Sequence, residues 1–268
     1  MLGRHIAGWL TALAAPFLLA ASLPPAPTPG GSAGEMRLRY DIYASGIPVL
    51  TLDFNLDESA AAYKVSGTVR AQGALGLISD FTLHTESRGV IAADQLLPSV
   101  HDNSSRARRK ERRAHLDFRH DGSVVAAVNP PEAPGPKVPT AEEVAGTVDP
   151  LTAILAIGHA VAQTGGCRVK VPVYDGRRRY DLVLADDGVE RLASAPLGKP
   201  TELRRCALDM VKLAGFTSDR DRPPRIEHGK VWIMPSPRAG APPLPARIEF
   251  RSDWGQIIVQ MARIDFAK

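Results

Sequence analysis

Two cysteines, Cys167 and Cys206, are the only thiol side chains in this chain of 268 residues. Such a pair could form a disulfide, ligate a metal or supply a catalytic thiolate. A metal site needs further ligands, and a thiolate nucleophile needs a partner histidine that the sequence does not identify. Because the N-terminal segment is typical of exported proteins, which meet oxidant, we expect a structural disulfide. Closing a loop of about 40 residues would remove roughly 4 kcal/mol of unfolded-state entropy.

The other residues that could do chemistry form no recognised catalytic pattern. Seven histidines are present, without HExxH or another metal-binding spacing. The one G-x-S-x-G match, Gly30 to Gly34, lies in a Pro/Gly-rich segment and not at a turn between a strand and a helix, and there is no G-x-x-x-x-G-K-[ST] loop and no G-x-G-x-x-G loop. We therefore assign no catalytic residue and predict no metal, cofactor or nucleotide chemistry. His159 lies in an apolar stretch, where we expect a core histidine bonded to the backbone rather than a general base.

The densest charge run in the chain lies between residues 106 and 113. Clustered cations could bind anionic lipid headgroups, lipopolysaccharide phosphates or another envelope polyanion. The simpler interpretation is a solvated hairpin loop or a charged sheet edge that discourages aggregation. The candidate contact residues are Arg106, Arg108, Arg109, Lys110, Arg112 and Arg113.

A second basic group, Arg177, Arg178 and Arg179, follows the turn Asp175-Gly176. Alternate side chains of a strand point to opposite faces, so Arg178 is expected on the apolar face that carries Tyr180. A guanidinium there needs a partner, and Asp181 or Asp209 could serve. The alternative is that the arginines line a cavity and clamp a carboxylate or phosphate. We favour structural ion pairing.

The N-terminal residues predict export to the periplasm. Arg4 and His5 precede the apolar run Ile6 to Ala21, which has the pattern of a signal peptide over residues 1–22. An uncleaved N-terminal anchor is the alternative, although the run is short and broken for a membrane span. The Pro/Gly-rich residues 23–35 are expected to form a disordered linker. We expect no transmembrane span after removal of the signal.

The charge of the chain argues against a nucleic-acid partner. The formal net charge is +4, and only 6% of residues are aromatic. The basic residues are not interleaved with aromatic ones, as a stacking surface for bases would require.

Alternation with a period of two dominates the chain after the linker. Met36, Leu38 and Tyr40 alternate with charged residues, and the same pattern recurs in about ten to twelve segments. Asp121-Gly122 and Asp175-Gly176 are hairpin turns. The fold class is therefore mainly β: one domain over residues 36–268 with a curved antiparallel sheet, which could be a barrel, half-barrel or β-spiral.

One segment has a helical pattern, over about residues 141–164. Thr140 with Glu143 resembles a capping box, and Asp149 before Pro150 is a second helix start. The residues that follow are apolar on nearly all sides until Gly165. Such a helix is buried, so we expect it to pack against the concave side of the sheet.

Several short motifs are similar to those of bacterial exported proteins of the family designated domain of unknown function 3108. The resemblance covers almost the whole chain after the linker. It implies export and a β-rich fold, and it supplies no reaction. The arrangement also resembles, more loosely, periplasmic β-spiral proteins linked to cell-envelope integrity. The most distinctive motifs are Val148-Asp149-Pro150-Leu151, the segment Val173 to Leu182, Cys206 and Leu244-Pro245-Ala246-Arg247-Ile248.

Two classes of function follow from these observations. The favoured one is a non-enzymatic periplasmic protein that contributes to envelope integrity by binding a lipid or other apolar ligand, or a protein partner, on its curved sheet. The alternative is a hydrolase or transferase that acts on an envelope polymer through a site assembled only by the fold. An apolar pocket would favour the first class, and a cleft with convergent titratable groups would favour the second.

Overall fold

We describe the protein from a computed structural model, in residues 34–108, 110–131, 138–192, 201–216, 228–252 and 255–266. The predicted signal peptide, most of the predicted linker and Arg109 lie outside these ranges. The first strand begins at Gly34, so the linker boundary predicted at residue 35 is slightly late. Contacts between Cα atoms group the chain from Gly31 to Lys268 into one compact unit.

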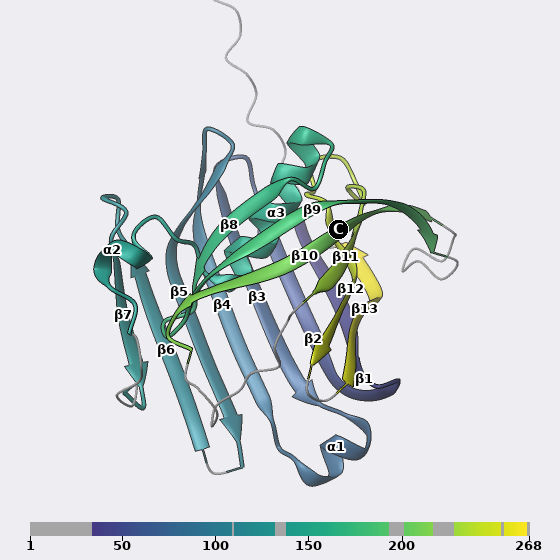
Figure 1. The fold of residues 1–268 in the computed structure, drawn as a ribbon, viewed down its shortest axis with the longest axis horizontal. Coiled ribbons are helices and arrows are strands. Elements are labelled where there is room, and N and C mark those ends of the chain that lie inside the picture. Colours follow the sequence, from purple (N-terminus) through teal and green to yellow (C-terminus); the bar gives the residue numbers. More distant parts are fainter. Residues whose placement is uncertain are drawn as a thin grey trace, which may run out of the picture. The chain divides into compact units, whose positions relative to one another are not determined.

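The described residues form a single antiparallel sheet of thirteen strands (Figure 1). Its order is β7-β6-β5-β4-β3-β2-β1-β13-β12-β11-β10-β9-β8, so the sheet is not closed and β7 and β8 are its edges. The predicted mainly β fold is confirmed. The strands are β1 Gly34–Ala44, β2 Ile47–Glu58, β3 Ala62–Ala71, β4 Thr82–Ala92, β5 Gln95–Ala107, β6 Lys110–Phe118, β7 Val124–Asn129, β8 Val169–Tyr174, β9 Arg179–Leu192, β10 Thr201–Ala214, β11 Gly229–Met234, β12 Leu244–Ser252 and β13 Gly255–Phe266.

The strands form where the sequence alternates. In β1, Met36, Leu38 and Tyr40 are buried, whereas Arg37 and Arg39 are exposed. The turn to β2 has positive φ at Ser45 and Gly46, as a two-residue hairpin turn of type I′ requires. The analysis of the sequence missed β5, whose residues do not alternate between apolar and polar types.

The predicted helix over residues 141–164 is divided into two, α2 Ala141–Val144 and α3 Pro150–Thr164. Gly146 between them has φ of +69°, which a continuous helix cannot contain. The predicted capping box at Thr140 and the predicted cap at Asp149 are both formed. A further short helix, α1 Gly73–Ile78, was not predicted. No helix in the described part of the chain is long and apolar enough to cross a membrane.

Helix α3 lies inside the curl of the sheet, as predicted. In Figure 1, β8 to β10 pass across the face of β2 to β5, with α3 beside them. One side of α3 joins a core with β1 to β3 and β11 to β13, through Leu151 and Leu155. Its other side joins a second core with β8 to β11, through Ala153 and Ile157. The helix therefore fills the space that the curved sheet encloses.

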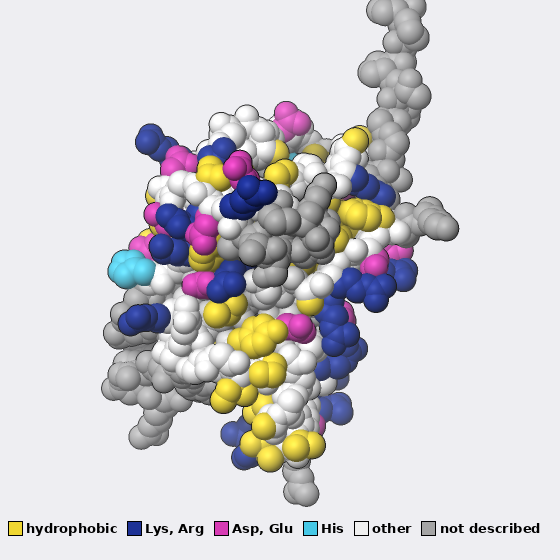
Figure 2. Space-filling view, turned by 90° about the vertical axis from the view of Figure 1, so that its right-hand side faces the viewer, with side chains coloured by type: hydrophobic (Ala, Val, Ile, Leu, Met, Phe, Trp, Pro, Cys, Tyr) yellow, Lys and Arg dark blue, Asp and Glu magenta, His cyan; other side chains and the backbone are white. Residues whose placement is uncertain are grey.

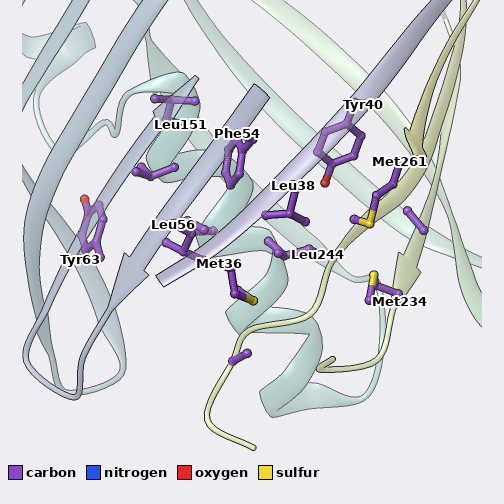
Figure 3. Packing of buried hydrophobic residues seen from close by; sticks show 14 of the residues in the cluster. Met36, Leu38, Tyr40, Phe54, Leu56, Tyr63, Leu151, Met234, Leu244 and Met261 are labelled. Atoms are coloured by element: carbon purple, nitrogen blue, oxygen red, sulfur yellow. The ribbon is translucent and has the colours of Figure 1, made fainter. Parts of the chain in front are cut away.

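The first core is built mainly from large apolar side chains. Figure 3 shows Leu38 and Tyr40 of β1 pointing towards Leu244 and Met261. The buried Tyr40 hydroxyl donates a hydrogen bond to the Pro245 carbonyl oxygen at 2.9 Å. This bond satisfies the polar group that burial would otherwise leave unpaired.

Edge strand β8 of the open sheet is partly covered by side chains and by one short backbone contact. Val148 forms a parallel bridge with Val173 of edge strand β8. Beside it, Tyr174, Leu116 and Val144 form a small third core between β8, β6 and α2. Packing of this kind protects strand edges that would otherwise be open to other chains.

Close approach of α3 to the segment before β12 makes Gly158 sensitive to substitution. A Cβ atom at Gly158 would lie 2.1 Å from the Pro243 carbonyl oxygen. We expect Gly158→Ala to lower the free energy of unfolding by about 1–3 kcal/mol, despite the better helix propensity of alanine, because the backbone must shift. Urea denaturation measures this. Gly166→Ala, where the nearest atoms lie at 3.6 Å, is the control and should change stability little; equal effects would contradict the prediction.

Candidate functional site

The predicted disulfide is present, and it joins two elements that are not neighbours in the sheet. Cys167 and Cys206 are bonded, with Cα atoms 5.7 Å apart. Cys206 lies in β10, whereas Cys167 lies two residues before the start of β8, and β9 runs between these strands. Both cysteines are fully buried in the second core. The bond therefore fixes the exit of α3 to β10, the third strand from the β8 edge, and is structural.

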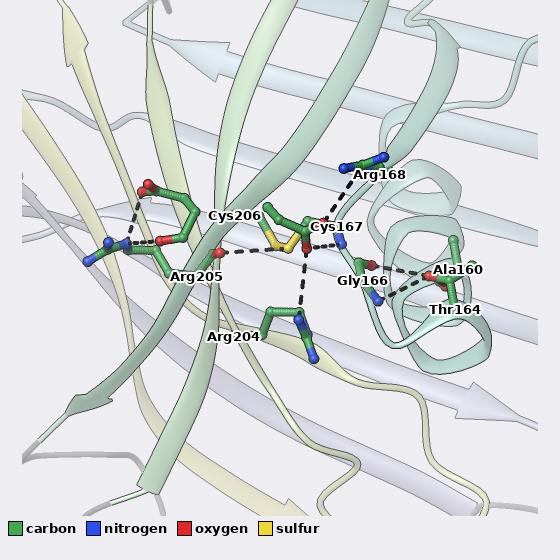
Figure 4. A network of polar contacts seen from close by, with 10 residues as sticks. Ala160, Thr164, Gly166, Cys167, Arg168, Arg204, Arg205 and Cys206 are labelled. Carbon is green, nitrogen blue, oxygen red and sulfur yellow. Dashed lines mark hydrogen bonds and ion pairs between the residues drawn. A yellow bond between two sulfur atoms is a disulfide. The ribbon is translucent and has the colours of Figure 1, made fainter.

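Polar contacts hold the chain around the disulfide (Figure 4). The Cys167 amide donates to Asp186 Oδ1 at 2.8 Å, and Asp186 also lies within ion-pair distance of Arg168 and Arg204. The Thr164 hydroxyl donates to the Ala160 carbonyl oxygen at 2.8 Å, which satisfies an acceptor in the last turn of α3.

The three arginines after the β8–β9 turn serve mainly structural roles. Arg179, and not Arg178 as predicted, is the most enclosed: its side chain is 11% exposed and pairs with Asp181 at 2.6 Å. It also donates to the Glu143 carbonyl oxygen at 2.8 Å. Arg178 lies 3.9 Å from Asp175. The prediction placed Arg178 on the Tyr180 face because it counted alternation from within the turn, but β9 begins only at Arg179.

Arg177 and Arg179 tie the β8–β9 turn to distant segments. Arg177 donates to the Pro130 carbonyl oxygen at 3.0 Å, beyond edge strand β7, and Arg179 reaches α2. The contacts of these two side chains are therefore those of structural ties rather than of a clamp for a bound anion.

The basic run forms the hairpin between β5 and β6, which confirms the hairpin interpretation. Only Arg113 of this run pairs with β7, so Lys110, Glu111 and Arg112 pair with β5 alone among the described strands, and the interpretation as a charged sheet edge also holds for them. Arg113 pairs with Glu111 at 2.8 Å. The other described cations of the run are exposed, and none makes an ion pair with a described residue. We call these four the cationic hairpin: Arg106, Arg108, Lys110 and Arg112.

A serine, a histidine and an aspartate meet in the interior, a combination that the sequence did not suggest. Ser87 of β4 donates to Asp149 Oδ1 at 2.6 Å and lies 2.8 Å from His101 Nδ1 of β5. Thr152 donates to Asp149 Oδ2 at 2.5 Å and contacts the Tyr63 hydroxyl at 2.8 Å. Burial raises the pKa of the Asp149 carboxyl, but contacts with His101, Ser87 and Thr152 outweigh this, so the pKa is below its ordinary value.

This cluster does not have the arrangement of a hydrolase triad. In a triad the histidine stands between the serine and the aspartate, with one ring nitrogen for each. Here His101 Nδ1 faces both Ser87 and Asp149, and Nε2 has no hydrogen-bond partner among the described residues. Ser87, His101 and Asp149 are all fully buried, so a substrate cannot reach them. The cluster caps α3 and holds it against β4 and β5.

One candidate binding site is a cleft of about 730 Å³ between α3, β8 and the ends of β4, β5 and β6. Its volume lies within the range typical of small-molecule sites. Val90 and Leu97 on its walls are exposed large apolar residues. The apolar lining is Val90, Leu96, Leu97, Pro98, Phe118, Val148, Ala156, Ala160, Val169, Val171 and Pro172.

Nine polar or charged residues also line the cleft, among them His159 and Lys170. His159 Nε2 lies 3.0 Å from Glu58 Oε1, so this histidine faces a buried carboxylate instead of the backbone that we predicted. Lys170 Nζ lies 2.9 Å from Asp181 Oδ2. Neither in the cleft nor in the rest of the described residues is there a group of three or more His, Cys, Asp or Glu placed to hold a metal. The cleft therefore combines apolar walls with polar groups that could orient a ligand.

Comparison of the sequence with family models decides the relationship. The model described as protein of unknown function (DUF3108) matches residues 39–262. The chain belongs to the DUF3108 family. This confirms the resemblance that the motifs indicated. A search of curated proteins found none that matches this DUF3108 protein.

A solved structure similar to this DUF3108 protein is a β-barrel-like protein of domain of unknown function DUF1849 from Brucella abortus. The two share 12% sequence identity with a TM-score of 0.51, over 88% of this chain and 98% of the other. At that identity the likeness shows the fold alone.

Proposed function

We propose that this DUF3108 protein is a non-enzymatic envelope protein that binds a lipid or other apolar ligand in the cleft beside α3, and thereby contributes to envelope integrity. The single observation that carries the proposal is the cleft itself, whose walls are mostly apolar. Binding there removes apolar ligand surface from water, which is favourable in proportion to the area buried.

The polar groups of the cleft favour an amphipathic ligand. Lys170 is well exposed on one wall, and His159 of α3, which faces the buried Glu58 of β2, is a second polar group in the cleft. A ligand with an acyl chain and a polar head would place its chain along the walls and its head near one of these groups. A few positioned polar groups in an apolar site orient a ligand in this way.

Export to the periplasm is part of the proposal. It rests on the pattern of residues 1–22, and the Cys167–Cys206 disulfide is consistent with an oxidising compartment. The hydrolase alternative is less favoured. The Ser87, His101 and Asp149 cluster is fully buried and serves as a helix cap. Titratable groups do converge in a second, open cavity of about 570 Å³, among them His84, Asp102 and His115, and a hydrolase site would have to lie there.

Filling the cleft should weaken ligand binding. We expect Ala160→Trp to weaken binding of the fluorescent fatty acid 11-(dansylamino)undecanoic acid about tenfold or more, because the indole occupies the space of the acyl chain. The measurement is a fluorescence titration of purified protein. Ala162→Trp is the matched control, since Ala162 is exposed on the same helix and does not line the cleft.

Equal affinities of the wild type and Ala160→Trp would contradict a ligand site in this cleft. Lipid extraction from the purified protein gives an independent measurement, and the variant should yield less lipid than the control. A protein partner, the other class of ligand expected from the sequence, would instead co-purify with wild type and both variants alike.

A further inference from the structure

We propose that the end of the sheet that carries α1 docks onto a lipid bilayer with anionic headgroups. The surface consists of an apolar tip, defined here as Ile47, Ala74, Leu77 and Ile78, and the cationic hairpin beside it. This site is separate from the cleft and goes beyond the proposed function.

The apolar tip exposes large hydrophobic side chains at one place. Leu77 is 89% exposed, Ile78 is 75% exposed and Ile47 is 59% exposed. Helix α1 has no buried residue at all. Figure 2 shows hydrophobic side chains gathered at the lower end of the molecule, at the height of α1 in Figure 1, with Lys and Arg side chains around them. Contiguous exposed apolar groups indicate an interaction surface.

Hydrogen bonds place the two halves of the apolar tip together. The Gln72 amide donates to the Val49 carbonyl oxygen at 2.9 Å, and its side chain donates to the Leu50 carbonyl oxygen at 2.9 Å. These bonds fix the start of α1 against the first residues of β2, next to Ile47. The tip is therefore a formed part of the fold and not a loose loop.

The cationic hairpin lies at the same end of the sheet. The Arg108 amide donates to Asp80 Oδ1 at 2.6 Å, just after α1, and Arg106 pairs in register with Thr82 at the start of β4. On the other side of the tip, the Ser45 amide donates to the Gln256 carbonyl oxygen at 2.8 Å, and Gln256 pairs with the exposed Arg251. Cations thus flank the tip on both sides.

Charge complementarity selects an anionic bilayer as the occupant. Each Lys or Arg near such a surface gains electrostatic attraction, and apolar side chains gain by entering the acyl boundary. The two contributions act together, as stable association with a membrane usually requires two signals. The nearby acids Asp80 and Glu111 are occupied by the Arg108 amide and by Arg113.

Docking through the tip would hold the cleft away from the bilayer. Strand β4 runs from Thr82 near the tip to Ala92, and β5 returns from Gln95, so the β4–β5 turn lies at the opposite end, where Asp94 and Gln95 line the cleft. Eleven residues of strand span about 35 Å at roughly 3.3 Å each.

The test is flotation of purified protein with vesicles of phosphatidylcholine, alone or mixed equally with phosphatidylglycerol. Wild type should float with the anionic vesicles, and Leu77→Ser/Ile78→Ser should bind them at least about tenfold more weakly. The matched control is Val125→Ser/Val189→Ser, which removes two exposed apolar side chains from β7 and β9 and should bind as wild type does. All proteins carry the same N-terminus, so differences report on the altered side chains.

Reversing the charge with Arg106→Glu/Lys110→Glu should also weaken binding and reduce its dependence on salt. Unchanged binding of the tip variant, or no preference of the wild type for anionic vesicles, would overturn the proposal. Ala160→Trp should float as wild type does, so failure of the cleft and failure of the tip can be distinguished. Circular dichroism spectra matching the wild type confirm that each variant is folded.

Discussion

Protein that lacks the Cys167–Cys206 bond is expected to unfold with a free energy about 4 kcal/mol lower than that of the oxidised protein. The bond closes a loop with a sequence separation of 39. Without it, the unfolded chain gains the conformations that loop closure had removed. The loop contains all of β8 and β9, so loss of the bond frees both strands of this hairpin in the unfolded chain.

Guanidinium titrations with and without reductant measure this effect. The double variant Cys167→Ala/Cys206→Ala should unfold at the same concentration in both conditions, which controls for other effects of the reductant. Mass mapping of unreduced protein from a periplasmic extract should yield the linked peptide, which also tests the proposed export. Finding both thiols open to alkylation in that extract would contradict the bond, and finding no protein in the extract would contradict the proposed export.

Loss of the Asp149 carboxylate should have an effect of similar size. Asp149→Ala is expected to cost about 3–5 kcal/mol, because it leaves buried donors without an acceptor. Those donors are the Ser87 and Thr152 hydroxyls and the amides of Leu151 and Thr152, each amide bonded to Asp149 Oδ1 at 2.9 Å. Urea denaturation checks this value. Asp121→Ala removes a similar but exposed turn contact to Ser123 and should cost much less.

The same carboxylate predicts how stability depends on acid. The pKa of Asp149 is lower in the folded protein than its ordinary value, which is about 3.9. Its contribution is therefore complete above that ordinary value and is lost as pH falls through the folded pKa. Below about pH 4, wild type should lose stability more steeply than Asp149→Asn, which cannot titrate. Parallel acid profiles of the two proteins would show that Asp149 is not the group responsible.

Most of the strands could be predicted from the sequence because one side of the sheet is solvated. The alternation of apolar and polar residues in β1 and β2 follows from this solvated face. The helix ends could be predicted as well, because local hydrogen bonds determine the caps at Thr140, Asp149 and Gly165. Strand β5 could not be found in this way, because its inward residues include His101, which joins the polar cluster around Asp149. A strand with polar residues on its inward side therefore indicates a buried polar cluster, here the one around Asp149.

The candidate sites were less accessible to prediction. The cleft draws its walls from segments as distant as Val90 and Pro172, and only the fold brings them together. Helix α1 was missed because six residues with two glycines give no usable helical period. The ion pair of Arg179 with Asp181 could not be predicted because the sequence does not show that β9 begins at Arg179. A shift of one residue in the start of a strand moves each side chain to the other face.

The order of the sheet implies that it forms in two halves. Every neighbouring pair of strands in the described sheet is consecutive in the chain, except β1 with β13. Strands β1 to β7 can therefore pair as hairpins while the rest of the chain is still being made. The seam in which Met36 meets Phe266 must wait for the last residues. Until then β1 is an open edge of the sheet. Pairing β1 with β13 closes the longest loop of the sheet, so it costs the most chain entropy during folding.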